Sequence, residues 1–355
     1  MSAERLLLAA VLMLAAPAAR GEDFAGLSRD ALGFAEVKRG VPVVFPRDFG
    51  VHPEFRLEWW YVTANLKDDA GASYGMQWTL FRRSAAPGPE RAGFANQSLW
   101  MGHAAATAVD EHVFAETFAR GGVGQAGVDA TPFKAWIDDW SLESATDAPD
   151  AGLSQLRLAA RGARFAYALE LAAREPLVLH GDEGYSRKSE QGQASYYFSQ
   201  PFYSAKGVLT LDGREIKVSG EAWLDREWSS QPLAKHQTGW DWFALHLASG
   251  EKVMLYRFRS ASSGDEFAGT WIASDGTAQA LPAAGIKLTP LQQTQIGERT
   301  LPTRWRVEVA GHGLQIETTP LNPAAWNATR LAYWEGPISF RGSHQGEGYL
   351  EMTGY

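Results

Sequence analysis

The run Glu58–Leu66, EWWYVTANL, constrains the fold most, because a carboxylate and three aromatic rings occupy four consecutive positions. In a β-strand, successive side chains point to opposite faces. We therefore expect Glu58 and Trp60 on one face and Trp59 and Tyr61 on the other. A carboxylate then lies beside an indole on a surface that faces a core.

A second alternating run follows a short loop, so residues 58–81 predict a β-hairpin. Residues 240–258 repeat its aromatic pattern, with Trp60 aligned on Trp242. This repetition predicts that the chain consists of two related halves.

The rest of the chain contains many short alternating runs separated by turn residues such as Asp212-Gly213, and no long amphipathic helix. Such a pattern is typical of barrels and sandwiches. We predict an all-β protein of two barrel-like domains with few short helices. The expected divisions are an extended leader at 22–50, an N-terminal domain at 51–228 and a C-terminal domain at 229–355.

The first 21 residues have the features of a secretory signal peptide. The apolar run Leu6–Ala16 is too short to cross a bilayer, which needs about 20 residues, and small residues follow at possible cleavage points, Ala18-Ala19 and Gly21-Glu22. The chain has no cysteine, which excludes disulfides and lipid attachment through a thiol. We expect a periplasmic or secreted protein that does not span the membrane.

The charge balance argues against nucleic acid as a partner. The formal net charge is -8, and removal of Glu4, Arg5 and Arg20 with the leader changes it to -9. No run of basic residues is present, and nucleic-acid-binding proteins need a basic surface.

Aromatic residues are abundant, with 14 tryptophans, 11 tyrosines and 17 phenylalanines. Each large ring can bury roughly 150–250 Å². Two alternatives follow: the cores are rich in aromatic residues, or some rings line a cavity for an apolar or sugar-like ligand. Core packing is the simpler explanation for any single tryptophan.

Common catalytic motifs are absent: we find no Gly-x-Ser-x-Gly, no His-Glu-x-x-His and no phosphate-binding glycine loop. The eight histidines are not spaced as metal ligands. We therefore expect neither a metal nor another cofactor.

Carboxylates next to tryptophans recur along the chain. A carboxyl group held among indoles in a dry pocket has a raised pKa and can act as a general acid. This favours protonation of a carbon–carbon double bond followed by capture of water. The candidate catalytic residues are Glu58 and Asp225 as acids, with Arg226 positioning water or substrate. The alternative for each is a structural ion pair.

The candidate ligand-binding residues are aromatic or histidine side chains near these carboxylates or after long polar loops. For each of them, packing in a core is the alternative. They are Trp59, Trp60, Tyr61, His103, Tyr196, Tyr197, Trp228, Trp240 and Trp242.

Several long motifs carry a family resemblance: 52–66 (HPEFRLEWWYVTANL), 220–228 (GEAWLDREW), 239–243 (GWDWF) and 333–338 (YWEGPI). With these motifs, nearly all of the mature chain resembles the carotenoid 1,2-hydratase (hydroxyneurosporene synthase) and AttH-like secreted hydrolase family. The resemblance implies two lipocalin-like β-barrels with a ligand region in or between them.

The same resemblance implies hydration of isoprenoid double bonds in some members and a place beside lipoprotein-export-type ABC transporters in others. Hydratase-like members tend to have Trp-x-Asp-His-x-Trp, whereas this chain has Arg226 at the histidine position. Loss of a titratable histidine favours the AttH-like branch.

We therefore expect an exported, lipocalin-like protein that binds an apolar lipid- or isoprenoid-like molecule. Hydratase- or hydrolase-type activity is one alternative for its role. The other is a non-catalytic accessory protein of an ABC transporter that handles a lipid or lipoprotein client.

Overall fold

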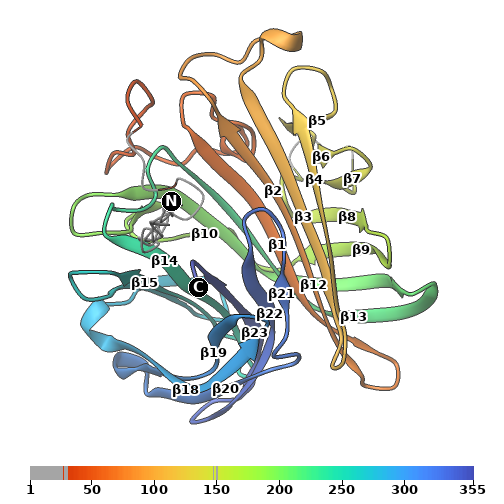
Figure 1. Ribbon diagram of the computed structural model, residues 1–355, viewed down its shortest axis with the longest axis vertical. Coiled ribbons are helices and arrows are strands. Elements are labelled where there is room, and N and C mark those ends of the chain that lie inside the picture. Colours follow the sequence, from red (N-terminus) through yellow and green to blue (C-terminus); the bar gives the residue numbers. More distant parts are fainter. Residues whose placement is uncertain (1–26, 28–30, 147, 149–150) are drawn as a thin grey trace, which may run out of the picture.

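The computed structural model describes residues 27, 31–146, 148 and 151–355. The predicted signal peptide, at 1–21, lies outside these residues. Two curled antiparallel sheets pack against each other, the first coloured from orange to green and the second from teal to blue (Figure 1). The all-β fold with two lipocalin-like, near-barrel sheets is confirmed.

The first sheet has the order β4-β3-β2-β1-β13-β12-β9-β8-β7-β6-β5, with β10 and β11 paired to β12. Its strands are β1 Leu57–Asp68, β2 Ser73–Ser84, β3 Ser98–Thr107, β4 His112–Arg120, β5 Ala126–Ala130, β6 Phe133–Ile137, β7 Trp140–Ser144, β8 Gln155–Arg161, β9 Phe165–Ala173, β10 Val178–Leu179, β11 Tyr185–Arg187, β12 Ala194–Leu211 and β13 Arg214–Ser229.

The second sheet has the order β17-β16-β15-β14-β23-β22-β20-β19-β18, with β21 paired to β22. Its strands are β14 Gln237–Leu247, β15 Lys252–Ser260, β16 Glu266–Ile272, β17 Ala278–Ala280, β18 Ile286–Ile296, β19 Arg299–Val309, β20 Leu314–Pro320, β21 Trp326–Asn327, β22 Tyr333–Gly342 and β23 Gly346–Thr353.

Helical structure in the described residues is limited to short 3-10 turns, at Arg47–Phe49, Gly93–Ala95, Ala283–Gly285 and Ala310–His312. No helix in this part of the chain is long and apolar enough to cross a membrane.

A small residue lets the first sheet close on itself. Gly102 of β3 lies so near β6 and β7 that an added Cβ would come within 2.8 Å of Ile137 and 3.1 Å of Trp140. Real Cβ atoms do not come as close as the contact with Ile137, so a larger residue at position 102 would push β3 away from β6.

Strand β1 is buried on both faces because it lies between an interior and an interface. Trp60 and Val62 pack in the core of the first sheet. Tyr61 instead belongs to the apolar cluster between the two sheets, and Trp59 packs against that cluster. The expected alternation of side chains in this strand is confirmed.

The two halves share a topology, but the predicted alignment between them is wrong, because it matches residues that lie on different faces of their strands. Strand β1 pairs with β2 and β13, and β14 pairs in the same way with β15 and β23. Trp60 faces the interior of its sheet, whereas Trp242 faces the other sheet, as Tyr61 does. A shift of one residue in a strand exchanges the faces, and an aromatic pattern alone does not reveal it.

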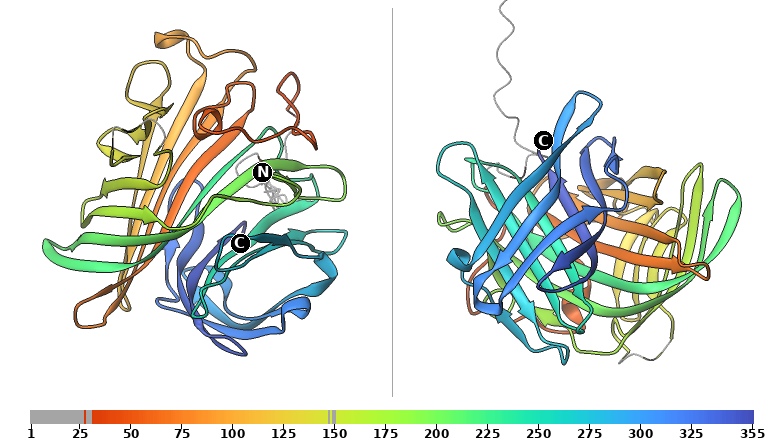
Figure 2. Two further views of the ribbon diagram at one scale, coloured as in Figure 1. Left: turned by 180° about the vertical axis from the view of Figure 1, so that it is seen from behind. Right: turned by 90° about the horizontal axis from the view of Figure 1, so that it is seen from below.

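The sheets meet where β2 contacts β22, and Figure 2 shows the orange strands of the first sheet beside the blue strands of the second. A Cβ at Gly75 would lie 2.5 Å from Pro337 and 2.6 Å from the Tyr349 hydroxyl, so only glycine permits this contact. Nearby, the Asn65 amide donates a hydrogen bond to the Gly348 carbonyl, 2.9 Å away. Both contacts fix the position of one sheet against the other.

Candidate functional site

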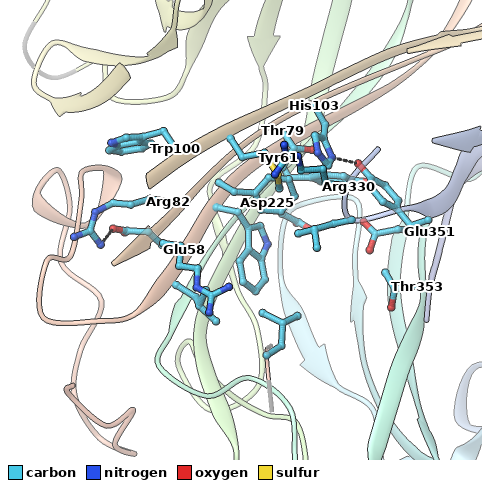
Figure 3. A pocket seen from close by; sticks show the side chains of 18 of the residues that line it. Glu58, Tyr61, Thr79, Arg82, Trp100, His103, Asp225, Arg330, Glu351 and Thr353 are labelled. Atoms are coloured by element: carbon cyan, nitrogen blue, oxygen red, sulfur yellow. Dashed lines mark hydrogen bonds and ion pairs between the residues drawn. The ribbon is translucent and has the colours of Figure 1, made fainter. Parts of the chain in front are cut away.

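A cavity of about 300 Å³ lies between the two sheets (Figure 3). Its walls are mostly aromatic and aliphatic, with a few polar groups. The first sheet contributes Trp59, Tyr61, Phe81 and Met101, and the second contributes Trp240, Trp242, Tyr256 and Tyr333.

Strand register places the polar groups of the first sheet in one row across the cavity wall. Asp225 of β13 is opposite Tyr61 of β1, which is opposite Thr79 of β2. Thr79 is opposite His103 of β3, and His103 is opposite Glu116 of β4. Residues directly opposite each other in an antiparallel sheet have side chains on the same face. These five residues are called the polar row below.

A second row, which lies two residues away from the polar row on each strand, is apolar. Trp59 is opposite Phe81, Phe81 is opposite Met101, and Met101 is opposite Phe118. All four line the cavity. A ligand lying across this apolar row would have one end at the polar row.

Asp225 is buried at the inner end of the cavity and accepts three hydrogen bonds. Tyr197 donates from its hydroxyl at 2.7 Å, Trp223 from its indole nitrogen at 2.6 Å, and Ser199 from its hydroxyl. Burial raises the pKa of Asp225 to about 7 despite these donors, and the nearby Glu227 raises it further. A substantial fraction of Asp225 is therefore protonated at neutral pH, as a general acid must be.

The second sheet faces Asp225 with two more carboxyl groups, Glu351 and Glu335, which are direct partners on β23 and β22. Trp240 donates its indole N–H to Glu351 at 2.7 Å, and Tyr61 donates its hydroxyl to Glu335. Burial and the neighbouring carboxylates raise the pKa of Glu351 to about 8. Burial, with the nearby Glu351, also raises the pKa of Glu335 well above its usual value.

His103 connects the two walls of the cavity. Its Nδ1 lies 2.9 Å from the Tyr333 hydroxyl on the second sheet, and its Nε2 lies 3.1 Å from Glu116. Burial lowers the pKa of His103 although Glu116 opposes that shift. At neutral pH the histidine is therefore an uncharged hydrogen-bonding group in the wall.

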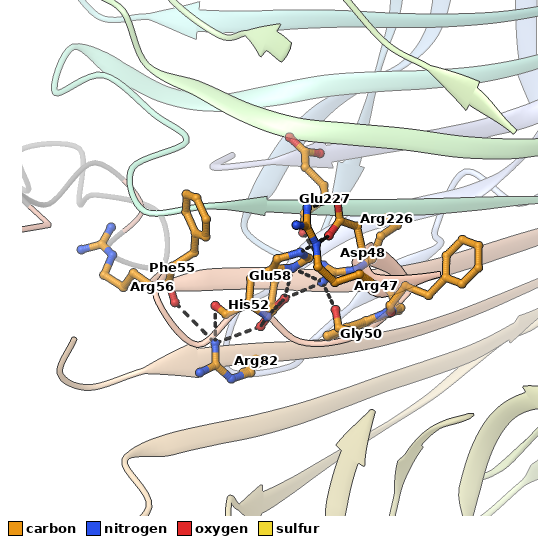
Figure 4. A network of polar contacts seen from close by, with 12 residues as sticks. Arg47, Asp48, Gly50, His52, Phe55, Arg56, Glu58, Arg82, Arg226 and Glu227 are labelled. Atoms are coloured by element: carbon orange, nitrogen blue, oxygen red, sulfur yellow. Dashed lines mark hydrogen bonds and ion pairs between the residues drawn. The ribbon is translucent and has the colours of Figure 1, made fainter. Parts of the chain in front are cut away.

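Glu58 and Arg226 lie on the opposite face of the first sheet from Asp225, so the three predicted catalytic residues do not form one site. Although Glu58 borders the cavity through β1, its carboxylate meets Arg226 at 2.5 Å and Arg82 at 2.9 Å (Figure 4). His52 adds a backbone N–H at 3.1 Å.

The expectation that indoles raise the pKa of Glu58 is therefore wrong. Burial does raise the pKa of Glu58, but Arg226, His52 and Arg82 outweigh it and hold the pKa well below its usual value. Glu58 stays ionised and cannot supply a proton near neutral pH. The Arg226 guanidinium, paired with this carboxylate, faces away from the cavity.

Three predicted ligand-binding residues pack around the buried ion pairs of Glu58 with Arg226 and Arg82 and do not line the cavity. Arg226 stacks on Trp60 at 3.9 Å, and His52 stacks on Trp228 at 4.1 Å. The Tyr196 hydroxyl bonds the backbone of Lys38 in the leader. Trp60, Trp228 and Tyr196 therefore have structural contacts.

Five other predicted ligand-binding residues do line the cavity, and one lies just behind its wall. The five are Trp59, Tyr61, His103, Trp240 and Trp242. Tyr197 donates to Asp225 from behind.

Sequence reasoning missed the polar groups of the second sheet and the threonine of the first. Tyr333 lies in the motif 333–338 that carries the family resemblance, but nothing in the sequence places Tyr333 or Glu351 across the cavity from Asp225. Thr79 could have been found from its position opposite Tyr61 in the predicted hairpin. In the described part of the chain, no group of three or more histidines and carboxylates is arranged to hold a metal ion.

A family model for AttH-like proteins matches residues 36–355. The chain belongs to the AttH-like family. An AttH protein from Nitrosomonas europaea has a solved structure that is 30% identical in sequence, with a TM-score of 0.81, and the match covers 91% of this chain and 99% of that one.

Two more distant solved structures share the AttH-like fold. Kievitone hydratase from Nectria haematococca is 16% identical with a TM-score of 0.67, over 90% of this chain and 96% of that one. CghA, solved with Sch210972, is 13% identical with a TM-score of 0.55, over 91% and 97% of the two chains. A search of curated protein sequences gave no match.

Proposed function

We propose that this AttH-like protein is exported and binds an apolar, lipid- or isoprenoid-like molecule in the cavity between its sheets. We further propose that Asp225 protonates a carbon–carbon double bond of that molecule, so that water is added to it. The observation that carries the proposal is a buried aspartic acid, with a pKa of about 7, at the end of an apolar cavity.

The proposed reaction needs only the groups of this cavity. The Asp225 O–H gives its proton to one alkene carbon and leaves a carbocation on the other. The faces of Trp59, Tyr61 and Trp242 favour that cation by roughly 0.5–2 kcal/mol each. A water oxygen then bonds to the cation and loses one proton to the Asp225 carboxylate, which restores the acid.

Two further facts support hydration over other chemistry. The donors from Tyr197, Ser199 and Trp223 hold the carboxylate that forms when the proton leaves. The fold is also shared with kievitone hydratase, which is named for a hydration reaction.

Asp225→Asn is expected to abolish hydration while ligand binding is retained. Asparagine keeps the shape of the side chain but has no acidic proton. The test incubates wild-type and variant protein with a panel of isoprenoids in water enriched in ¹⁸O and detects the labelled alcohol by mass spectrometry. Quenching of tryptophan fluorescence measures binding, since Trp59, Trp240 and Trp242 line the cavity.

We expect a labelled product from the wild-type protein and at least a hundredfold less from the variant, because general acids contribute roughly 10²–10⁴ in rate. Equal product from both would exclude Asp225 as the acid. Binding without product from the wild-type protein would favour a non-catalytic role, such as handling a lipid client beside a transporter. No binding by any lipid or isoprenoid would reject the proposal as a whole.

A further inference from the structure

A third row of residues continues the wall of the cavity outward and carries positive charge. This row lies two residues beyond the apolar row on each strand. In it, Leu57 is opposite Arg83, Arg83 is opposite Leu99, and Leu99 is opposite Arg120. Arg330, in the loop between β21 and β22, also lines the cavity. Arg83, Arg120 and Arg330 are exposed, and they are called the arginine rim below.

The rim combines these charges with exposed apolar side chains. Leu99 is 57% exposed, Phe118 is 47% exposed and Phe94 is 80% exposed. Arg120 lies over the ring of Phe94 at 5.8 Å, and Arg330 lies over that of Phe118 at 5.2 Å. The rim is therefore an amphipathic border of the cavity.

The guanidinium groups of Arg120 and Arg330 form no ion pair with a carboxylate in the described residues. Arg120 donates to the carbonyl of Phe94 at 2.7 Å. Glu116 is the carboxylate near Arg330, and it accepts a hydrogen bond from the Arg330 backbone at 3.0 Å. Two cationic groups thus remain available beside an apolar cavity, in a protein whose formal net charge is -8.

The inner end of the cavity has the opposite character. Asp225 and Glu351 line it there, and either of them repels an anion when it ionises. An anionic group is therefore disfavoured at the inner end and favoured at the rim. The three rows differ along one direction: carboxyl groups, then aromatic rings, then Arg83 and Arg120, while Arg330 lies over Phe118 of the apolar row.

We infer that the ligand is an amphiphile whose anionic head group, a phosphate or a carboxylate, is bound by the arginine rim. Its apolar body lies across Trp59, Phe81 and Met101, and its far end reaches Asp225. This inference rests on the proposed binding of an apolar ligand in the cavity. It adds three features to that proposal: the charge of the head group, the direction in which the ligand lies, and the distance between the head group and the reacting double bond.

The strand geometry sets that length. Tyr61 in the polar row and Leu57 in the rim row are four residues apart on β1. At about 3.3 Å per residue, the two rows are separated by about 13 Å. The reacting double bond should therefore lie about this far from the anionic group.

The test compares farnesyl monophosphate with farnesol, which has the same apolar body without the charge. Fluorescence titrations use the wild-type protein, the double variant Arg120→Gln/Arg330→Gln, and Arg341→Gln as the matched control. Arg341 is an exposed arginine of β22 that does not line the cavity. Arg83 is left unchanged because it takes part in another interaction, so its replacement would change more than ligand binding.

We expect the wild-type protein to bind the monophosphate at least tenfold more tightly than farnesol at low salt, and salt to reduce that preference. The double variant should lose the preference and bind farnesol as before, and the control should behave as wild type. Equal wild-type affinities, or equal losses for both ligands in the double variant, would overturn the inference and leave binding in the cavity intact. Failure of both ligands to bind would reject the cavity proposal and the inference with it.

A vesicle arm identifies the source of the anion when the preference is found. Vesicles of phosphatidylcholine alone are compared with vesicles that also contain phosphatidylglycerol. Sedimentation with only the anionic vesicles, lost in the double variant, would support a head group presented by a membrane. Absence of sedimentation, together with preference for the monophosphate, would support a dissolved ligand.

Discussion

At pH 8, the Asp225→Asn variant is expected to have a free energy of unfolding about 2–4 kcal/mol larger than that of the wild-type protein. Asp225 has a pKa of about 7 in the folded protein, against an ordinary value of 3.8. Between these pH values the folded state binds more protons than the unfolded state. Wild-type stability therefore falls as the pH rises from about 4 to 7, and asparagine, which cannot ionise, removes this loss.

Asparagine also reproduces the hydrogen bonds of the protonated acid. Its carbonyl oxygen can accept from Ser199 and Trp223, and its amide can donate to the Tyr197 oxygen. Urea denaturation at pH 4, 6 and 8 measures the difference, which should be smallest at pH 4 and largest at pH 8. The control Asp69→Asn, in the exposed turn after β1, should stay within about 0.5 kcal/mol of wild type. A difference independent of pH, or a destabilised variant at pH 8, would contradict the assignment.

Glu58→Gln is expected to lower the free energy of unfolding by about 3–5 kcal/mol at pH 7. The change removes the negative charge that Arg226 and Arg82 face inside the first sheet. Both arginines are fully buried, so water cannot replace the lost partner. Removing one partner of a buried ion pair costs far more free energy than the intact pair contributes to stability.

The pH dependence of this pair has the opposite sign from that of Asp225. Because the pKa of Glu58 is lowered on folding, its contribution is present above the ordinary range of a glutamate and is lost as the pH falls below it. Denaturation with urea at pH 7 and pH 3 should therefore show a smaller effect of Glu58→Gln at pH 3. The control Glu54→Gln changes an exposed glutamate in the loop that precedes β1. A loss below about 1 kcal/mol at pH 7 would show that the network is not a structural core.

The sequence was sufficient to predict the strand at Glu58–Leu66, its two faces and the position of Asp225 beside an indole. Alternation along one strand depends only on local geometry, so Trp60 and Tyr61 could be assigned to different faces without knowledge of their partners. The signal for Asp225 was equally local, since Trp223 is two residues away and donates to it.

The partners of these residues could not be read from the sequence because they depend on long-range register. Strand β13 is buried on both faces from Ala222 to Ser229, so no polar alternation distinguishes the face of Arg226 from that of Asp225. Glu335 and Glu351 meet only because β22 pairs with β23 in one register. The choice between an acid and an ion pair at Glu58 required the position of Arg82 across the hairpin.

Photo-crosslinking tests most directly whether the ligand lies between the sheets. A farnesol analogue with a diazirine on its apolar body would be bound, irradiated and mapped by mass spectrometry, with and without excess farnesol. We predict labels on cavity residues of both sheets, such as Trp59, Met101 and Tyr256, that excess farnesol removes. Labels confined to the interior of the first sheet, at residues such as Trp78 and Leu158, would contradict the account.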